Sequence, residues 1–190
     1  VVELIMLNTF YIIGAPACGK TTQMEKIMNG WEVVEEFKKP IRYTVYRSGK
    51  NLNIYLGRKR DVFSGTDTLS FTALKFMNGL YSAWDSLKVF NCVVGEGDRL
   101  ANGKFFDIAK SYGELNLLSL ELDEIVRNER AEARAKENNL EIQNYDWVKS
   151  RITKHQKLAK QYQAYRLDCT GKHRNKIFVE IAENFSKIGL

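Results

Sequence analysis

One short stretch has the sequence Gly14-Ala15-Pro16-Ala17-Cys18-Gly19-Lys20-Thr21, which matches the phosphate-binding pattern G-x-x-x-x-G-K-S/T. Glycines at this spacing let consecutive backbone N–H groups turn toward an anion, and the positive end of the following helix adds to the attraction. In such a loop Lys20 bridges the β- and γ-phosphates of ATP, the Thr21 hydroxyl ligates Mg²⁺ and Thr22 contacts the α-phosphate. A plain tight turn is the alternative interpretation. We expect residues 14–22 to hold the phosphates of a nucleotide, with no redox role for Cys18.

Strand-like and helix-like patterns alternate on both sides of this loop. Residues 8–13 form an apolar run typical of a buried strand, and further strands are expected at 42–47, 52–56, 89–94, 115–122 and 165–169. Helices are expected at 20–29, 69–77, 80–87, 104–111, 123–136, 145–163 and 176–187, with Gly79 as a break and Asp123 as an N-cap. This order predicts an α/β fold in which helices cover both faces of a mostly parallel sheet.

The composition is that of an ordinary globular protein. The 190 residues are 44% hydrophobic and 27% charged with two prolines, which excludes collagen-like and largely disordered classes. The longest apolar run is far shorter than the roughly 20 residues of a membrane span. Three widely spaced cysteines without a CxxC pair argue against a disulfide framework or a zinc site. We expect one cytoplasmic domain over residues 1–190, without a membrane or an obligate protein partner.

Positive charge is concentrated in the second half of the chain. The whole sequence has a net charge of +6, while residues 127–176 contain 13 Lys and Arg against 6 Asp and Glu, a local net charge of +7. Such a concentration steers polyanions, and nucleotides or nucleic acids are the usual partners. A solvated, lysine-rich helix face is the alternative. If DNA binds here, the residues expected to contact its backbone are Lys149, Arg151, Lys154 and Lys157.

A second group of candidates follows the strand expected at 89–94. Glu96-Gly97-Asp98-Arg99 places two carboxylates and a guanidinium at the carboxyl end of a strand, where open α/β sheets bind ligands. Glu96 can ligate Mg²⁺, either carboxylate can act in catalysis, and Arg99 can neutralise charge on a transferred phosphoryl group. A surface ion pair between Glu96 and Arg99 is the alternative. The chain has no Asn-Lys-x-Asp guanine motif, which argues against a GTPase.

Three arginines lie three and four residues apart on the helix expected at 123–136, so Arg127, Arg130 and Arg134 should point the same way. A polar stretch at 138–144 and a second basic helix follow them. In small nucleotide kinases this arrangement is a lid whose arginines act in catalysis by closing over the donor phosphates. Pairing with the glutamates of the same helix is the alternative.

The acceptor site is expected between the second strand and the third, where the chain runs from Leu56 to Ser70. The candidates for substrate binding are Arg58, Arg60, Thr66 and Asp67. Asp67 can accept the proton of an attacking hydroxyl, and it can also be the N-cap of the helix that follows. Tyr81 and Trp84 can stack on a base, although aromatic residues at helical spacing more often belong to a core.

Together these residues resemble a P-loop nucleoside or nucleotide kinase. The fragments 64–70 (SGTDTLS) and 96–102 (EGDRLAN) are similar to those of a bacteriophage-encoded branch, in which some members phosphorylate the hydroxymethyl group of 5-hydroxymethyluracil in DNA. The resemblance implies the P-loop kinase three-layer sandwich, a helical lid over about 127–160, adenine near 165–172, ATP and Mg²⁺ as cofactors, and DNA as acceptor. Glu96-Gly97-Asp98-Arg99 differs from the Asp-Arg-aromatic motif of thymidylate kinases and from the Glu-Arg-Ser motif of deoxynucleoside kinases. A kinase of a free nucleoside or nucleoside monophosphate and a non-catalytic NTP-binding module remain alternatives.

Overall fold

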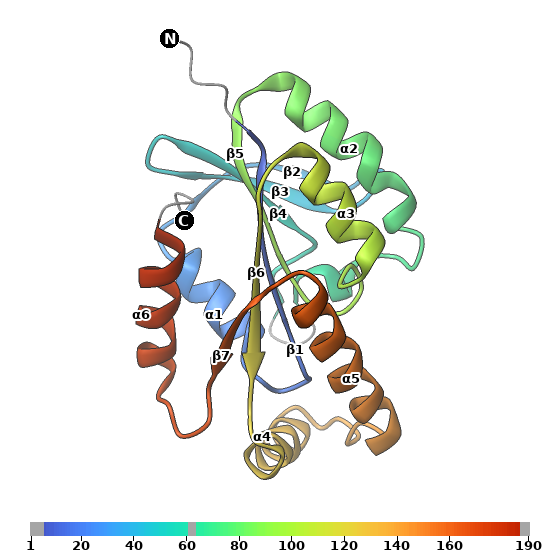
Figure 1. Cartoon of the computed structure of the whole chain (residues 1–190), viewed down its shortest axis with the longest axis vertical. Helices are drawn as coiled ribbons and strands as arrows, with labels where there is room; N and C mark the ends of the chain where they lie inside the picture. Colours follow the sequence, from blue (N-terminus) through green and yellow to red (C-terminus); the bar gives the residue numbers. More distant parts are fainter. Residues whose placement is uncertain (1–5, 61–63, 187–190) are drawn as a thin grey trace.

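A seven-stranded sheet runs through the molecule in the order β2-β3-β4-β5-β1-β6-β7 (Figure 1). The computed structural model describes residues 6–60 and 64–186. Its strands are β1 (Asn8–Gly14), β2 (Glu32–Phe37), β3 (Tyr43–Ser48), β4 (Asn51–Leu56), β5 (Phe90–Glu96), β6 (Leu115–Glu121) and β7 (Tyr165–Asp168). Its helices are α1 (Lys20–Ile27), η1 (Thr66–Thr68, a 3₁₀ turn), α2 (Leu74–Leu87), α3 (Gly103–Tyr112), α4 (Glu124–Glu137), α5 (Tyr145–Gln161) and α6 (Arg174–Phe185). Strands β4, β5, β1, β6 and β7 are parallel to one another, and β2 and β3 complete one edge in antiparallel pairing.

Helices cover both faces of this sheet because its central strand is apolar on both sides. In β1, Phe10 and Ile12 face the layer of α1 and α6, whereas Tyr11 and Ile13 face the layer of α2, α3 and α5. All four side chains are fully buried. The predicted three-layer α/β sandwich is therefore confirmed.

The edge strand β2 was not expected from the sequence. Its residues, EVVEEF, are largely exposed and include three glutamates, a residue type that is depleted in strands. The strand forms because β3 offers it a free edge, and the two pair in antiparallel register from Glu32–Arg47 to Phe37–Tyr43. The strands expected at 42–47 and 52–56 are confirmed as β3 and β4, which form an antiparallel hairpin with Ser48 opposite Asn51 at the turn.

Helix α2 is continuous through Gly79, so the predicted break at this residue is wrong. Gly79 lies on the exposed side of the helix, while Met77, Tyr81 and Trp84 form its buried side. The Tyr81 hydroxyl lies 2.8 Å from the Thr9 hydroxyl, and both aromatic side chains belong to the core. The possibility that they stack on a substrate base is therefore wrong. The helix also begins later than expected, at Leu74.

Helix α4 lies at the end of the sheet where β1 and β6 terminate, and α5 runs from this end back along one face of the sheet (Figure 1). Helix α4 begins as predicted, because the Asp123 carboxylate accepts a hydrogen bond from the backbone N–H of Ile125 at 2.9 Å. The last expected helix starts slightly earlier, at Arg174, and its predicted end at residue 187 lies outside the described residues. Within the described part of the chain, no helix is both long and apolar enough to span a bilayer.

Candidate functional site

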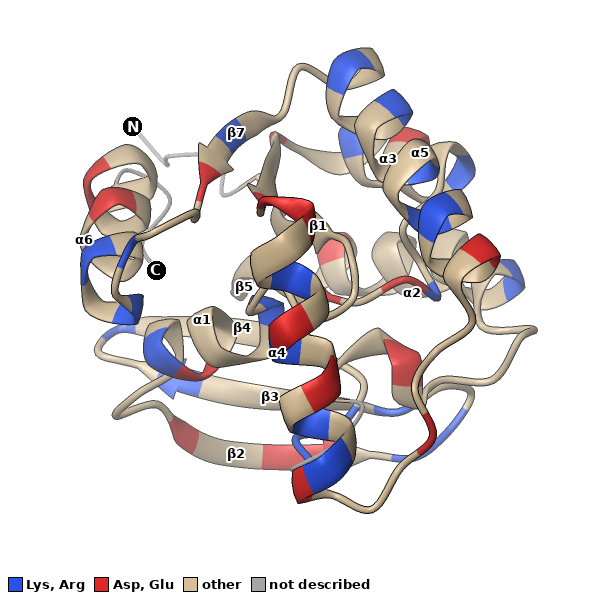
Figure 2. Ribbon diagram, turned by 90° about the horizontal axis from the view of Figure 1, so that it is seen from below, with Lys and Arg blue, Asp and Glu red and all other residues tan. Residues whose placement is uncertain are grey.

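A cavity of about 940 Å³ opens at the carboxyl ends of β1 and β5. It is bounded by the loop after β1, the turn η1, the segment after β5 and the helices α4 and α5. Seen from this end of the molecule, Lys and Arg recur along α4 and α5, and acidic residues alternate with them on α4 (Figure 2). The predicted site residues that line the cavity are Gly14, Pro16, Ala17, Gly19, Lys20, Thr21, Thr22, Arg60, Asp67, Glu96, Asp98, Arg99, Arg130 and Arg134.

The loop between β1 and α1 has the shape of an anion cradle. Positive φ angles at Gly14 (148°), Ala17 (64°) and Gly19 (94°) turn the backbone around the loop, and no side chain caps the first turn of α1. The Lys20 ammonium curls back over the loop and donates to the carbonyl oxygens of Gly14 at 2.9 Å and Ala15 at 3.0 Å. The free helix end and the positioned cation fit the phosphates of a nucleotide. Cys18 is buried beneath the loop, in the core layer of α1 and α6.

The two predicted metal ligands are adjacent. The Thr21 hydroxyl donates to Glu96 Oε1 at 3.1 Å, and Glu96 is only 1% exposed. Burial raises the pKa of Glu96 to about 7, although the nearby Lys20 opposes the shift. The expected alternative, a surface ion pair of Glu96 with Arg99, is therefore wrong. Among the described residues no cluster of three or more His, Cys, Asp or Glu side chains can hold a metal by itself. The pair fits Mg²⁺, which takes one or two protein oxygens together with phosphate oxygens.

Asp67 connects the turn η1 to the segment that follows β5. Its Oδ1 accepts hydrogen bonds from the backbone N–H groups of Asp98 at 2.8 Å and Arg99 at 3.1 Å. The N-cap of α2 is Ala73, so the expectation that Asp67 caps this helix is wrong. Asp67 lines the cavity, as a residue that acts on a substrate must.

Two predicted substrate contacts lie elsewhere. The Thr66 side chain is fully buried, donates to the carbonyl oxygen of Glu96 at 2.9 Å and lies 2.7 Å from the Tyr11 hydroxyl. The prediction that it touches substrate is wrong, and its hydrogen bonds instead attach η1 to the end of β5. Arg58 forms an isolated antiparallel β-bridge with Gly65. Among the described residues Arg60 lines the cavity and Arg58 does not.

Asp98 is surrounded by three basic side chains of α5, which changes its expected role. Its carboxylate lies 2.9 Å from Lys154 Nζ, 3.0 Å from His155 Nε2 and 3.0 Å from Arg151 Nη1. Partial burial opposes ionisation, but the hydrogen bonds from His155 and Lys154 prevail and hold the pKa of Asp98 well below its usual range. A carboxylate held in this way is a poor proton acceptor. Asp98 attaches the segment after β5 to α5. The predicted catalytic role of a carboxylate therefore remains for Asp67 and Glu96, which line the same cavity.

The three arginines of α4 do not share one environment. Arg130 and Arg134 line the cavity, whereas Arg127 is 4% exposed and lies 3.8 Å from Glu124 Oε1. Arg127 is in the first turn of α4, where the helix joins the body of the protein, and the other two lie one and two turns further along. The expected role over the donor phosphates therefore remains for Arg130 and Arg134 alone.

Two aromatic residues of the cavity were missed by the sequence reasoning. Phe71 is 89% exposed, and the guanidinium carbon of Arg99 lies 3.6 Å from the centre of its ring. Trp147 is 40% exposed, and the guanidinium carbon of Arg151 lies 5.1 Å from the centre of its ring. Aromatic residues in a helical pattern are normally assigned to a core, and only their exposure next to a cationic cavity distinguishes these two.

The sheet order and the phosphate loop define a P-loop kinase-like fold, and Thr21 and Glu96 lie together beside the loop. The chain belongs to the P-loop nucleotide kinase 3 family, whose model matches residues 6–183. The protein is therefore a kinase with a nucleotide-binding site. No curated protein matches it by sequence. An unliganded crystal structure of a sugar kinase from Janibacter sp. HTCC2649 is similar over 93% of both chains, with a TM-score of 0.51 and 12% sequence identity, which is a likeness of fold.

Arg130, on the helix expected to form the lid, should act mainly on the transition state. Replacing it with alanine is expected to lower kcat roughly 10²-fold while raising the KM for ATP much less, because its charge matters most as the phosphoryl group leaves. Steady-state kinetics with ATP as the varied substrate measure both constants. The control is Lys136→Ala, which removes an exposed cation of the same helix. Unchanged activity of the Arg130 variant would place this arginine on a solvated face.

Proposed function

We propose that this kinase transfers the γ-phosphoryl group of ATP to a hydroxyl of a nucleic-acid component, and that its acceptor is the hydroxymethyl group of 5-hydroxymethyluracil in DNA. The observation that carries the proposal is the composition of one cavity. Its donor side contains the phosphate loop, and its acceptor side contains aromatic rings paired with arginines. A base and its phosphates present the complementary chemistry, an aromatic face next to negative charge.

The chain's own residues divide the work of phosphoryl transfer. Lys20 holds the phosphates, and Thr21 and Glu96 would hold Mg²⁺, which neutralises phosphate charge when bound. Arg130 and Arg134 place two further positive charges on the cavity from the lid. Asp67 is assigned as the acceptor of the hydroxyl proton, because it lines the cavity and is not locked in ion pairs as Asp98 is.

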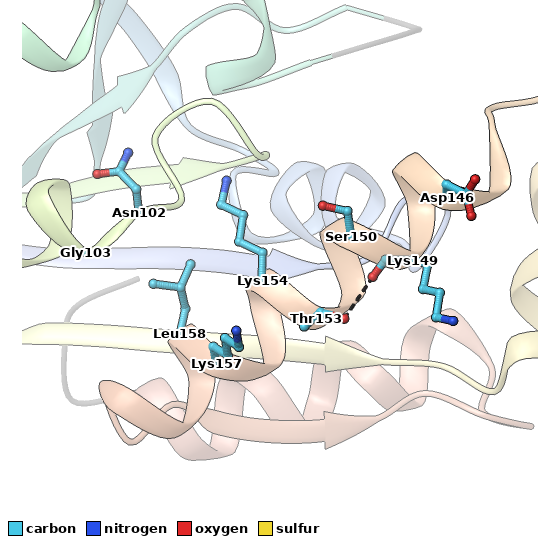
Figure 3. Close-up of a pocket in the computed structure, with 9 residues that line it drawn as sticks. All are labelled: Asn102, Gly103, Asp146, Lys149, Ser150, Thr153, Lys154, Lys157 and Leu158. Atoms are coloured by element: carbon cyan, nitrogen blue, oxygen red, sulfur yellow. Dashed lines mark hydrogen bonds between the residues drawn. The ribbon is translucent and has the colours of Figure 1, made fainter.

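A second cavity supports a polymeric acceptor. It measures about 690 Å³ and lies between the start of α3 and one side of α5 (Figure 3). Lys149, Lys154 and Lys157 line it together with Asn102 and Gly103, and Lys154 lines the catalytic cavity as well. From Lys149 to Lys157 the helix rises about 12 Å, which is the span of several consecutive backbone phosphates. A free nucleoside monophosphate that fills the catalytic cavity has no phosphate left for this groove.

The direct test is incubation with labelled ATP and Mg²⁺ against a panel of acceptors. The panel contains free nucleosides, nucleoside monophosphates, unmodified DNA and DNA that contains 5-hydroxymethyluracil. We expect label to enter only the modified DNA. Label in a free nucleoside or nucleotide would favour a small-molecule kinase. ADP formation that no acceptor accelerates would indicate a non-catalytic nucleotide-binding module.

The groove can be tested separately from the chemistry. The variant Lys149→Ala/Lys157→Ala is expected to weaken DNA binding uniformly across sequences and to flatten the slope of log K against log salt concentration by about two units. Lys154 and Arg151, two of the four basic residues expected to contact the DNA backbone, are left unchanged because they form ion pairs with Asp98. ATP hydrolysis without acceptor should not change.

The matched control is Lys160→Ala/Lys176→Ala, which removes the same charge from exposed positions of α5 and α6 outside the groove. Binding of both variants and the wild type is measured at two salt concentrations. If the groove variant and the control have the same slope as the wild type, the backbone does not lie in this groove.

A further inference from the structure

One histidine joins the phosphate loop to the opposite side of the cavity. His155 lies in the middle of α5 and is 3% exposed. Its Nδ1 is 3.2 Å from the backbone nitrogen of Gly14, and its Nε2 is 3.0 Å from Asp98 Oδ1. A single side chain therefore bridges the first residue of the phosphate loop and the segment that follows β5.

The two partners determine the protonation state of this imidazole. The backbone N–H of Gly14 can only donate, so Nδ1 must be an unprotonated acceptor. The Asp98 carboxylate, which is ionised, accepts a hydrogen bond from Nε2, so Nε2 carries the proton. The ring is therefore neutral and in one tautomer, and a second proton would have to break the bond to Gly14.

The charges that face the ring favour this neutral form. Burial lowers the pKa of His155 below its ordinary value, and the positive charges of Lys20 on α1 and Lys154 on α5 lower it further. Asp98, on the segment after β5, opposes them. The geometry and the surrounding charges thus agree on an uncharged imidazole at neutral pH.

Gly14 is held tightly at the point where His155 contacts it. A Cβ on Gly14 would lie 2.6 Å from the carbonyl oxygen of Leu120 on β6 and 2.7 Å from the Cys18 sulfur. Its N–H is taken by His155 and its carbonyl by Lys20. When Lys20 turns toward bound phosphates, it must give up its hydrogen bond to the Gly14 carbonyl. The hydrogen bond from the Gly14 N–H to His155 then still holds Gly14 in place.

We propose that His155 is a positioning residue for nucleotide binding, which in its neutral Nε2–H form fixes the start of the phosphate loop against α5 and Asp98. The inference rests on the kinase activity and the phosphate loop, and it is independent of the acceptor. Helix α5 follows the lid helix α4, and Asp98 lies two residues after Glu96. His155 is thus the link between the loop, the lid and the segment that carries the metal-binding carboxylate.

The variants His155→Leu and His155→Gln test this role. Leucine removes both hydrogen bonds, and we expect the KM for ATP to rise about tenfold at every pH, the effect of losing one or two buried hydrogen bonds. Glutamine carries one acceptor and one donor but does not titrate. It should keep the KM within about threefold of the wild-type value at pH 8.

The pH dependence separates positioning from a merely structural role. As the pH falls, the wild-type KM for ATP should rise in step with the protonation of His155 followed by NMR, and the His155→Gln variant should lack this rise. The titrations of ATP itself and of Glu96, whose pKa is about 7, are common to all these variants and cancel in the comparison. The control is His173→Gln, because His173 is exposed and is the only other histidine of the chain. Its variant should respond to pH as the wild type does.

Nitrogen NMR of the wild-type protein observes the tautomer directly, and it does not depend on whether a variant folds. The His155 resonances, distinguished from those of His173 by the His173→Gln variant, should show a protonated Nε2 and an unprotonated Nδ1 at pH 7. An Nδ1–H tautomer or an imidazolium at this pH would overturn the proposal. A folded His155→Leu variant with the wild-type KM, or a His155→Gln variant with the wild-type pH response, would overturn it as well.

Discussion

Replacing Lys20 with alanine is expected to lower the rate of phosphoryl transfer at least ~10³-fold while leaving the protein folded. The hydrogen bonds of its ammonium to oxygen go to two carbonyl groups of its own loop. Its charge also favours the buried Glu96 carboxylate, but Glu96 keeps its hydrogen bond from Thr21 and can take up a proton because its pKa is about 7. The lost rate comes from the positive charge that the phosphates require. Transfer from labelled ATP measures the first effect, and thermal unfolding followed by circular dichroism measures the second.

The matched control for Lys20 is Lys26→Ala. Lys26 lies on the same helix, and its ammonium donates to Asn175 on α6 at 2.7 Å, on the outside of the molecule. We expect normal transfer from this variant. Normal transfer from the Lys20 variant, in contrast, would contradict the assignment of the loop as the catalytic phosphate site.

Replacing Glu96 with glutamine is expected to lower activity and to raise stability. Glutamine keeps an oxygen that can accept from Thr21 but removes the negative charge offered to Mg²⁺, and kcat should fall roughly 10²-fold. In the protein without nucleotide and metal, the same charge is costly because Glu96 is buried. The free energy of unfolding of the variant should exceed that of the wild type at pH 8 by up to about 3 kcal/mol.

The sign of this effect depends on pH in a defined way. The pKa of Glu96 is about 7 in the folded protein against 4.5 for the unperturbed group, so the folded state retains a proton that the unfolded state releases. The wild type therefore loses stability as the pH rises from about 4.5 to about 7, and the variant does not share this loss. Denaturant unfolding at pH 5 and pH 8 without Mg²⁺ or nucleotide measures the difference.

The control for Glu96 is Glu25→Gln, which neutralises an exposed carboxylate that lines the same cavity. It should change neither stability nor kcat appreciably. Equal stabilities of the Glu96 variant and the wild type at both pH values would show that the charge of Glu96 is compensated in the folded protein. Full activity of this variant would remove Glu96 from the metal site.

The central part of the fold could be predicted from the sequence because its causes are local. The apolar run of β1, the pattern from Gly14 to Thr21 and the Asp123 cap each act within a few residues, and the structure contains all three as expected. Thr21 and Glu96 could also be paired in advance. Each follows a strand expected at the centre of a parallel sheet, whose carboxyl ends meet at one edge.

The roles of the other polar residues depend on which elements pack together. Nothing in the sequence around Asp67 and Asp98 distinguishes the roles of the two aspartates. In the structure, α5 brings three basic side chains to Asp98, whereas Asp67 accepts hydrogen bonds from two backbone N–H groups. Arg127 and Arg130 are one turn apart on α4, and only the docking of this helix buries one and leaves the other on the cavity.

The sequence by itself thus determined three consecutive elements around the phosphate loop: a buried strand, a loop that can bind an anion, and a helix that begins with a lysine and a threonine. Only the tertiary structure decided that β2 joins the edge, that Gly79 does not interrupt α2, and that His155 contacts Gly14 across 141 positions of the chain. The physical reason is the range of the forces involved. Backbone conformation and capping are set by neighbours in sequence, whereas burial, ion pairing and the protonation of a side chain are set by neighbours in space.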